Sequence, residues 1–280
     1  MTWSDLKKTS SGWQVWSPTI ASGFPLQNCK PLIAGDVNGD GKTDLICPFD
    51  YGNGSTQTIV QLNQGNGFSG WHGWSPTIAS GFPLQNCKPL IAGDLNGDGK
   101  TDLICPFDYG GGSTQTIVQI SQGNTFSGWQ GWSPTLASGF PLQNCKPLIA
   151  GDLNGDGKTD LICPFDYGGG STQTIVQISQ GNTFSGWQGW SPTLASGFPL
   201  QNCKSLTAGD VNGDGKTDLI CPFDYGNGST QTIAQLLVDG AAGLVNSVKS
   251  GFGADTSIAY KPITDNGTHT KDHSAAYPYL

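Results

Sequence analysis

The chain has 280 residues, and all 21 of its acidic residues are aspartate while all 13 basic residues are lysine. The lack of glutamate and arginine, with 42 glycines and a single methionine, leaves few strong helix formers and excludes long helices. A net charge of −8 argues against nucleic acid and anionic membranes as partners and makes a cation the more natural one.

The N-terminal segment, residues 1–12, has no basic region followed by an apolar run, so no Sec-type export signal is visible. No apolar stretch in the chain approaches the roughly 20 residues that cross a bilayer, and we expect no membrane insertion. Residues 3–12 align loosely with residues 61–70, which makes 1–12 a candidate closure segment at the edge of a repeat array.

A repeat of 58 residues dominates the rest of the chain. Residues 88–145 and 146–203 are identical, and the same period relates Trp16 to Trp74, Trp132 and Trp190. The predicted repeats are 13–70, 71–128, 129–186 and 187–238.

Four strands are expected in each repeat. In the second repeat, β-branched and aromatic residues between turn signals predict strands at Trp71–Ala79, Lys88–Gly93, Asp102–Phe107 and Thr114–Ile120. Four short strands per repeat are typical of one propeller blade. We therefore predict an all-β fold, a four-bladed β-propeller in which Trp13–Ile20 completes the last blade and removes an exposed edge. An open stack, or a larger ring made by two chains, is the alternative.

Each repeat carries one acidic loop between its second and third expected strands. Oxygen-bearing side chains at loop positions 1, 3, 5 and 9, a main-chain carbonyl at 7 and glycine at 6 match the needs of Ca²⁺. The predicted ligands, with about four ions per chain, are Asp36, Asn38, Asp40, Lys42 and Asp44; Asp94, Asn96, Asp98, Lys100 and Asp102; Asp152, Asn154, Asp156, Lys158 and Asp160; and Asp210, Asn212, Asp214, Lys216 and Asp218, each lysine through its carbonyl.

Two other interpretations of this loop were weighed. An EF-hand is excluded because Cys47 occupies position 12, where a bidentate glutamate is required, and because the flanking residues read as strands. A metal-free hairpin turn would also use Asn-Gly and Asp-Gly. It would not need three carboxylates in nine positions, which repel one another without a cation.

The loop resembles a known family. Asp36-x-Asn38-x-Asp40-Gly41-x-x-Asp44, followed by Leu-Ile, is similar to the calcium loop of FG-GAP (integrin α-chain type, also called VCBS) repeats. The resemblance covers roughly residues 13–238 and implies a β-propeller with calcium ligands at these positions. That family usually has more repeats than the four seen here.

The segment 239–280 is expected to form a hairpin and tail. Within it, Leu244–Asp265 is similar to the segment that follows such repeats in bacterial SpvB-like, insecticidal toxin complex B-type and RHS-related proteins. The resemblance implies a short relative or a fragment of that class, and it does not transfer a toxin role.

Eight cysteines occur as four pairs, each 18 residues apart. A disulfide within each repeat, a disulfide between neighbouring blades and a reduced buried pair all fit this spacing. Hairpin pairing centred on Asp40 would place Cys47 near Ile33 and not opposite Cys29. A zinc site is less favoured, because no CxxC or nearby histidine is present.

No catalytic motif is found, and an acid repeated four times does not make one active site, so we expect no enzyme. Trp71, Trp74, Phe82 and Tyr109 fit packing between blades, or sugar platforms of a multivalent lectin. The sequence thus predicts an extracellular calcium-binding scaffold whose protein or glycan ligand is unknown. Identical repeats also allow self-association.

Overall fold

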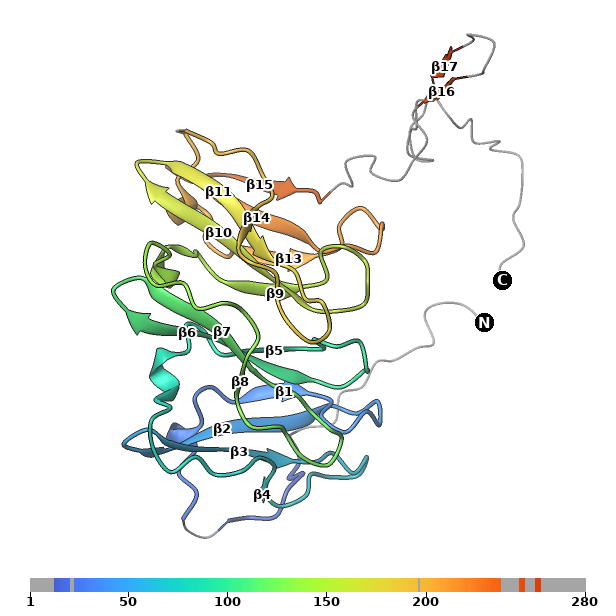
Figure 1. Ribbon diagram of the computed structural model, residues 1–280. Helices are drawn as coiled ribbons and strands as arrows, with labels where there is room; N and C mark the ends of the chain where they lie inside the picture. Colours follow the sequence, from blue (N-terminus) through green and yellow to red (C-terminus); the bar gives the residue numbers. More distant parts are fainter. Residues whose placement is uncertain (1–12, 21–22, 196, 238–246, 250–254, 258–280) are drawn as a thin grey trace, which may run out of the picture. The chain divides into compact units, whose positions relative to one another are not determined.

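The computed structural model describes residues 13–20, 23–195, 197–237, 247–249 and 255–257. The chain divides into two compact units, Met1–Leu237 and Val238–Leu280. The first unit contains four antiparallel sheets that follow one another along the chain (Figure 1).

The strands recur with the repeat. The first sheet contains β1 (Ile33–Gly35), β2 (Asp44–Gly52), β3 (Ser55–Gln61) and β4 (His72–Gly73). The second contains β5 (Ile91–Gly93), β6 (Asp102–Gly110), β7 (Ser113–Gln119) and β8 (Gln130–Gly131). The third contains β9 (Ile149–Gly151), β10 (Asp160–Gly168), β11 (Ser171–Gln177) and β12 (Gln188–Gly189). The fourth contains β13 (Thr207–Gly209), β14 (Asp218–Gly226) and β15 (Ser229–Gln235). A short 3₁₀ turn precedes each sheet: η2 (Leu26–Asn28), η3 (Leu84–Asn86), η4 (Leu142–Asn144) and η5 (Leu200–Asn202).

The outer strand of each of the first three sheets comes from the beginning of the next repeat. The expected strand Trp71–Ala79 forms a two-residue strand, β4 of the first sheet, and pairs with β3 again only at a bridge between Ile78 and Thr56. Trp74 and Ser75 both donate their amides to the carbonyl of Thr58, which breaks the ladder, and Pro76 has no amide to donate. A sheet therefore spans two repeats.

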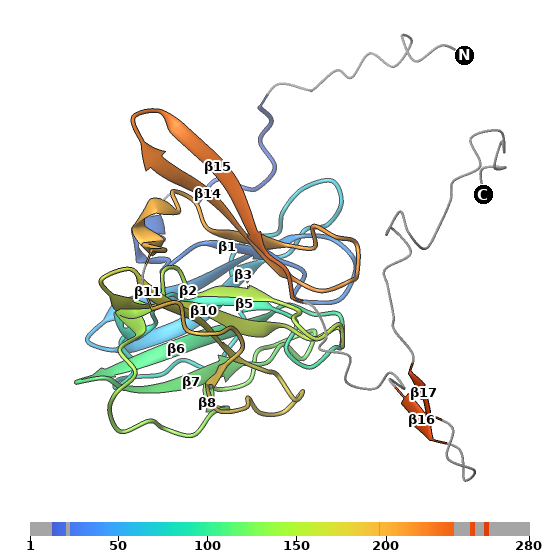
Figure 2. The same cartoon turned by 90° about the horizontal axis from the view of Figure 1, so that it is seen from above.

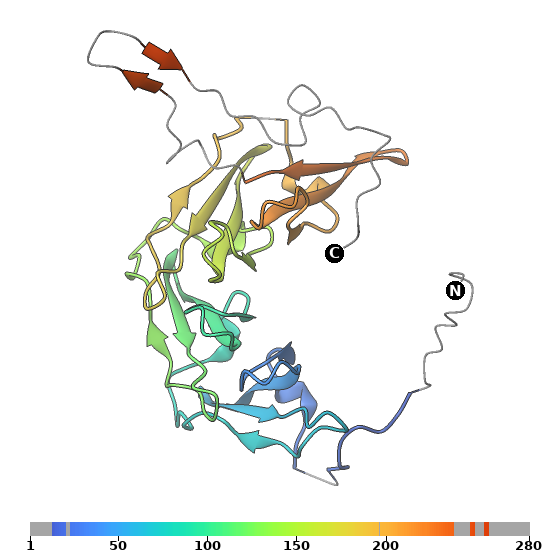
Figure 3. The same cartoon turned by 90° about the vertical axis from the view of Figure 1, so that its right-hand side faces the viewer.

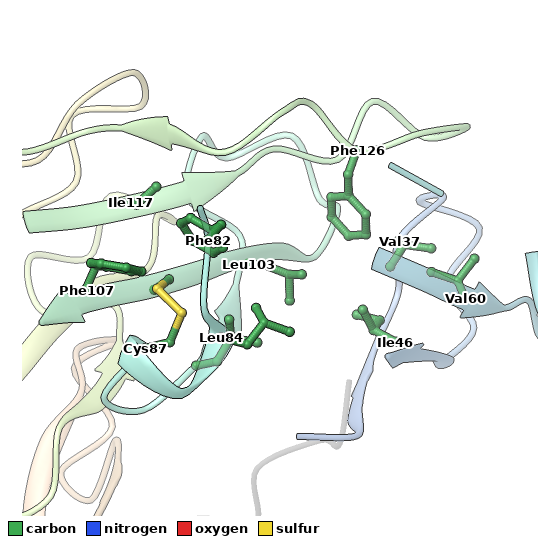
Figure 4. Packing of buried hydrophobic residues seen from close by; sticks show 12 residues of the cluster. Val37, Ile46, Val60, Phe82, Leu84, Cys87, Leu103, Phe107, Ile117 and Phe126 are labelled. Carbon is green, nitrogen blue, oxygen red and sulfur yellow. A yellow bond between two sulfur atoms is a disulfide. The ribbon is translucent and has the colours of Figure 1, made fainter. Parts of the chain in front are cut away.

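The central strands are apolar on both faces because both faces are covered: in the first sheet the second sheet packs on one face, and Phe24, Cys29 and Trp71 pack on the other. On β2 and β3, Ile46, Cys47 and Val60 have no exposed surface. Alternation is therefore replaced by an almost continuous apolar run. Figure 4 shows Val37, Ile46 and Val60 of the first sheet facing Leu103 and Phe126 of the second.

Within the first unit, consecutive sheets meet through their first strands. β1 adjoins β5, β5 adjoins β9 and β9 adjoins β13. Figure 3 shows the four sheets following one another around a curve, as blades of a propeller do. The first and fourth sheets each keep an apolar face exposed, so the structure establishes the all-β repeated sheets and not a closed ring.

The expected closing strand is not formed. Residues 13–20 lie outside any strand, and the fourth sheet has three strands. The carbonyl of Trp16 instead accepts a hydrogen bond from the amide of Phe68, in the loop after β3, and the two rings meet edge to face with centroids 6.1 Å apart. Residues 13–20 therefore contact the first sheet through Trp16.

Each repeat contains its own disulfide. Cys29–Cys47, Cys87–Cys105, Cys145–Cys163 and Cys203–Cys221 have Cα–Cα distances of 4.9, 4.8, 4.9 and 5.2 Å. The register explains why hairpin symmetry alone does not predict this pairing. Ile33 pairs with Ile46 and Cys29 bridges to Phe49, so the first strand has one residue more than the strand it faces and bulges, which brings Cys29 beside Cys47.

In the second unit, β16 (Ser247–Lys249) pairs antiparallel with β17 (Asp255–Ser257), as a hairpin in 239–280 requires. The rest of that segment and the closure segment 1–12 lie outside the described residues.

Candidate functional site

The acidic loop joins the first and second strands of every sheet, and its first aspartate organises it. In the first loop, Asp36 Oδ1 accepts the amides of Gly39 and Asp40 at 2.8 and 3.2 Å, and Oδ2 accepts that of Gly41 at 2.7 Å. Gly39 and Gly41 have φ of 76° and 79°, which favours glycine at both positions. The local sequence therefore fixes a tight, amide-lined turn.

The middle of the loop is tied by shorter-range bonds. Asn38 Oδ1 accepts the amide of Asp40 at 2.9 Å, and Asp40 Oδ1 accepts that of Lys42 at 2.9 Å. The ammonium of Lys42 also reaches Asp40 Oδ2 at 2.9 Å. This hydrogen bond holds the pKa of the Asp40 carboxyl below its usual range.

Asp44, the last predicted ligand, is fully buried at the start of β2. Its Oδ2 accepts the amide of Val37 at 3.0 Å, and its Oδ1 accepts that of Asn63 at 2.8 Å. The carboxylate thus connects the loop to the chain that follows β3. The sequence places Asp44 in the loop but gives no sign of this second role, because Asn63 lies 19 residues away.

Burial without a matching positive charge changes the acidity of these buried aspartates. In the second sheet, desolvation first and the charges of Asp98 and Asp94 second outweigh the opposing amide bonds and raise the pKa of Asp102 to about 7. In the third sheet the same causes raise the pKa of Asp160 to about 6. Both carboxylates lie in an environment that would favour a neighbouring cation.

The geometry repeats in all four loops. The three amide bonds to the first aspartate recur at Asp94, Asp152 and Asp210, with lengths of 2.6–3.2 Å. The buried aspartate likewise accepts two amides at Asp102, Asp160 and Asp218. The predicted ligand positions are therefore gathered in one loop per sheet, as the sequence indicates.

The loop side chains have the donor chemistry of a hard-cation site. Ca²⁺ prefers carboxylate, amide and carbonyl oxygens. The aspartates of the loop supply the carboxylates, the asparagine supplies the side-chain amide oxygen, and the lysine supplies its main-chain carbonyl. A carboxylate has about four acceptor positions, so the amide bonds leave acceptor capacity on Asp36, Asp40 and Asp44. Within the described ranges, however, no three His, Cys, Asp or Glu side chains converge as a metal-binding group, because the carboxylates face the loop's own amides.

The loops also form the junctions between sheets. The amide of Thr101, in the second loop, donates to the carbonyl of Asp36 in the first at 2.6 Å. A Cβ added to Gly35 would lie 2.5 Å from the Thr101 side chain. Gly93 with Thr159, and Gly151 with Thr217, repeat this contact. Sequence reasoning missed this role; the only signal is a glycine before and a threonine within every acidic loop.

The aromatic residues considered for sugar binding are engaged in packing. Trp71 stacks on Phe24 with centroids 4.7 Å apart, and Trp129 stacks on the buried Phe82 at 4.8 Å. Trp74 packs against the core shared by the first two sheets. Tyr109, at the end of β6, is half exposed.

A cavity of about 350 Å³ lies between the third and fourth sheets. Its lining is mainly apolar and includes Phe198, Leu206 and Ile233. The apolar lining does not resemble a sugar-binding site, which needs convergent polar groups.

Fold and loops together define a class, all-β proteins built from tandem antiparallel sheets with one acidic, glycine-rich loop per sheet. A model of the FG-GAP-like repeat matches residues 36–105, 94–163 and 152–221, and the chain belongs to this repeat family. Part of the chain is also 27% identical over 142 residues to the T-cell immunomodulatory protein homolog of Plasmodium falciparum (isolate 3D7). That similarity covers 49% of this chain and 19% of the relative, so the chain spans about a fifth of that protein's length. No helix in the described part of the chain is long and apolar enough to cross a membrane.

Proposed function

We propose that this chain is an extracellular binding module whose four acidic loops each bind one Ca²⁺. The observation that carries the proposal is the same loop, with the same pattern of amide hydrogen bonds, in all four sheets. In each loop the ligands would be the side chains at positions 1, 3 and 5, the main-chain carbonyl of the lysine at position 7, and the buried aspartate at position 9.

Charge supports this assignment. Twelve of the 21 aspartates lie in the four loops, and four divalent ions would offset the net charge of −8. Burial raises the pKa values of Asp102 and Asp160, and a bound cation would stabilise the charged form of both carboxylates. Bound calcium would neutralise these groups and join the first and second strands of each sheet.

The loop positions connect the ion to the fold. Because Thr101 of one loop donates to the carbonyl of Asp36 in the preceding loop, ordering one loop also orders the contact with the neighbouring sheet. Calcium would therefore stabilise the junctions between sheets, which present the binding surface. We expect no catalytic activity from this arrangement.

Four disulfides and FG-GAP-like repeats support an extracellular location. Disulfides persist in oxidising compartments, and calcium sites of millimolar affinity fill outside cells. A protein ligand is the main expectation for such a scaffold. The tail's likeness to SpvB-like and RHS-related proteins stays a prediction.

Isothermal titration of chelator-stripped protein with Ca²⁺ tests the proposal. We expect about four ions per chain, and about three after Asp94→Asn with Asp98→Asn in the second loop. Asp108→Asn, near the end of β6 in the same sheet, is the matched control and should leave the stoichiometry unchanged. Absence of binding by the unaltered chain would remove the proposal.

A multivalent lectin is the second candidate, favoured only by the repetition of half-exposed aromatic residues such as Tyr109 and Tyr167. Repeated weak sites bind multivalent glycans through avidity. A glycan array probed with calcium-loaded protein tests this function. Binding abolished by Tyr109→Ala together with Tyr167→Ala would support it, and an array without signal would exclude it.

A further inference from the structure

The two end sheets of the first unit expose opposite halves of one interface, and we propose that the fourth sheet docks onto the first sheet of a second copy of this chain. Three contacts between consecutive sheets already exist within one chain, and they use equivalent residues. We call the face that a sheet turns toward the next sheet its outgoing face, and the face that it turns toward the preceding sheet its incoming face. A fourth contact of the same kind would join the outgoing face of the fourth sheet to the incoming face of the first sheet.

The outgoing face is apolar and uncovered. Val37, Leu95 and Leu153 at the equivalent positions of the first three sheets are at most 1% exposed, because the next sheet covers them. Val211 of the fourth sheet is 48% exposed. On β15, the last strand of this sheet in Figure 2, Ala234 is exposed, whereas its counterparts Val60, Val118 and Val176 have no exposed surface.

The incoming face shows the reverse pattern. Leu84 and Leu90 of the second repeat are 3% and 5% exposed beneath the first sheet. Their counterparts Leu26 and Leu32, in the first repeat, are 58% and 48% exposed. The two faces are therefore the separated halves of the core that Figure 4 shows between the first and second sheets.

Polar groups on the two faces also correspond. Thr58 donates to Gln119 at 2.5 Å across the first junction, and Thr116 to Gln177 and Thr174 to Gln235 repeat this bond. The positions left over by the same period are Thr232 on the fourth sheet, which is exposed, and Gln61 on the first, which is 4% exposed. Thr232 is therefore the member of this pair that lacks its partner on the surface, and Gln61 is already buried within its own chain.

The glycine contact at the junction follows the same rule. Gly35, Gly93 and Gly151 each receive a threonine of the next loop against the backbone. Gly209 of the fourth sheet meets nothing closer than the side chain of Ile220 at 3.9 Å. The threonine without such a glycine is Thr43, in the first loop.

A second copy would cover both end faces. The repeats are similar and meet through equivalent contacts, and after three such contacts Val211 at one end and Leu26 and Leu32 at the other are still exposed. A head-to-tail arrangement of copies would repeat this contact. Such contacts close into a ring of chains or extend into a filament.

Sedimentation and light scattering over a range of concentrations, with calcium and with chelator, test the proposal. We expect a mass of two or more chains for the unaltered protein. Val211→Asp and Leu32→Asp should each give single chains, because each places a charge in one apolar half of the contact. Their mixture should give pairs, because each variant keeps the half that the other has lost. Tyr109→Asp, equally exposed but on neither face, is the control and should remain assembled.

Substitution of the junction glycines separates docking from folding. Gly209→Ala should leave the single chain as stable as before and weaken association at least about tenfold. Gly151→Ala should lower the stability of the single chain, since its Cβ would lie 2.5 Å from Thr217. The proposal would be overturned if the unaltered protein had the mass of a single chain both with calcium and with chelator. It would also be overturned if Val211→Asp and Leu32→Asp each still assembled.

Discussion

The buried aspartate at the end of each acidic loop is the residue on which the local structure most depends. Asp102 accepts the amides of Leu95 and Ser121 at 2.9 and 2.7 Å and has no exposed surface. The other two aspartates of the loop, Asp94 and Asp98, bind only groups of the loop itself, namely its main-chain amides and, at Asp98, the side chains of Lys100 and Asn96. A buried donor that loses its acceptor is costly, whereas an exposed one binds water.

Asp102→Ala should therefore lower the free energy of unfolding by about 2 kcal/mol or more, because two buried amides lose their acceptor. Asp108→Ala is the matched control, since Asp108 accepts one amide, that of the exposed Gly110, near the end of β6. We expect it to cost about 1 kcal/mol or less. Urea unfolding in chelator measures both without any contribution from calcium, and equal midpoints would contradict this role of Asp102.

At the scale of elements, a disulfide encloses each acidic loop. Cys87 and Cys105 are 18 residues apart and flank the second loop, which runs from Asp94 to Asp102. The bridge limits how far the first strand and the loop can separate from β6. It therefore supports the loop geometry whether or not an ion is bound.

Cys87→Ala with Cys105→Ala should lower the free energy of unfolding by about 3 kcal/mol on the loop-entropy model. Cys203→Ala with Cys221→Ala, in the fourth sheet, is the comparison, because the disulfide that it removes closes a span of equal length. Similar losses in urea unfolding would indicate a common effect on the unfolded chain. Thiol labelling of the native protein without reductant should detect no free cysteine, and labelling of paired cysteines would contradict the bridges.

The period, the central strands and the position of the loops could be predicted from the sequence because each depends on neighbouring residues. Asp102–Phe107, for example, lies within β6. The outer strand and the disulfides could not be predicted in the same way. The length of the outer strand depends on Trp74, whose amide shares the carbonyl of Thr58 with the next amide and so ends the ladder. The disulfide pairing depends on one extra residue between Cys29 and Ile33. Both are long-range effects of packing between repeats.

For the whole molecule, the repeated junctions make stability a sum over similar sheets and interfaces. Each junction combines a shared apolar core with a loop-to-loop hydrogen bond, such as that from Thr159 to the carbonyl of Asp94 at 2.6 Å. A cation that orders the loops would thus act at every junction at once.

Removal of calcium should consequently lower the melting temperature of the entire array. A site at free calcium 100 times its dissociation constant adds about 2.7 kcal/mol to the folded state. For an array of this size, four such sites correspond to a shift of more than about 10 °C. Calorimetric melting in excess chelator and in millimolar Ca²⁺ measures the difference. Mg²⁺ should stabilise less, because it demands near-ideal octahedral geometry and keeps its water. A protein with asparagine at Asp36, Asp94, Asp152 and Asp210 should lose the calcium-dependent shift, whereas identical melting of the unaltered chain in both buffers would show that its loops are held by their amides alone.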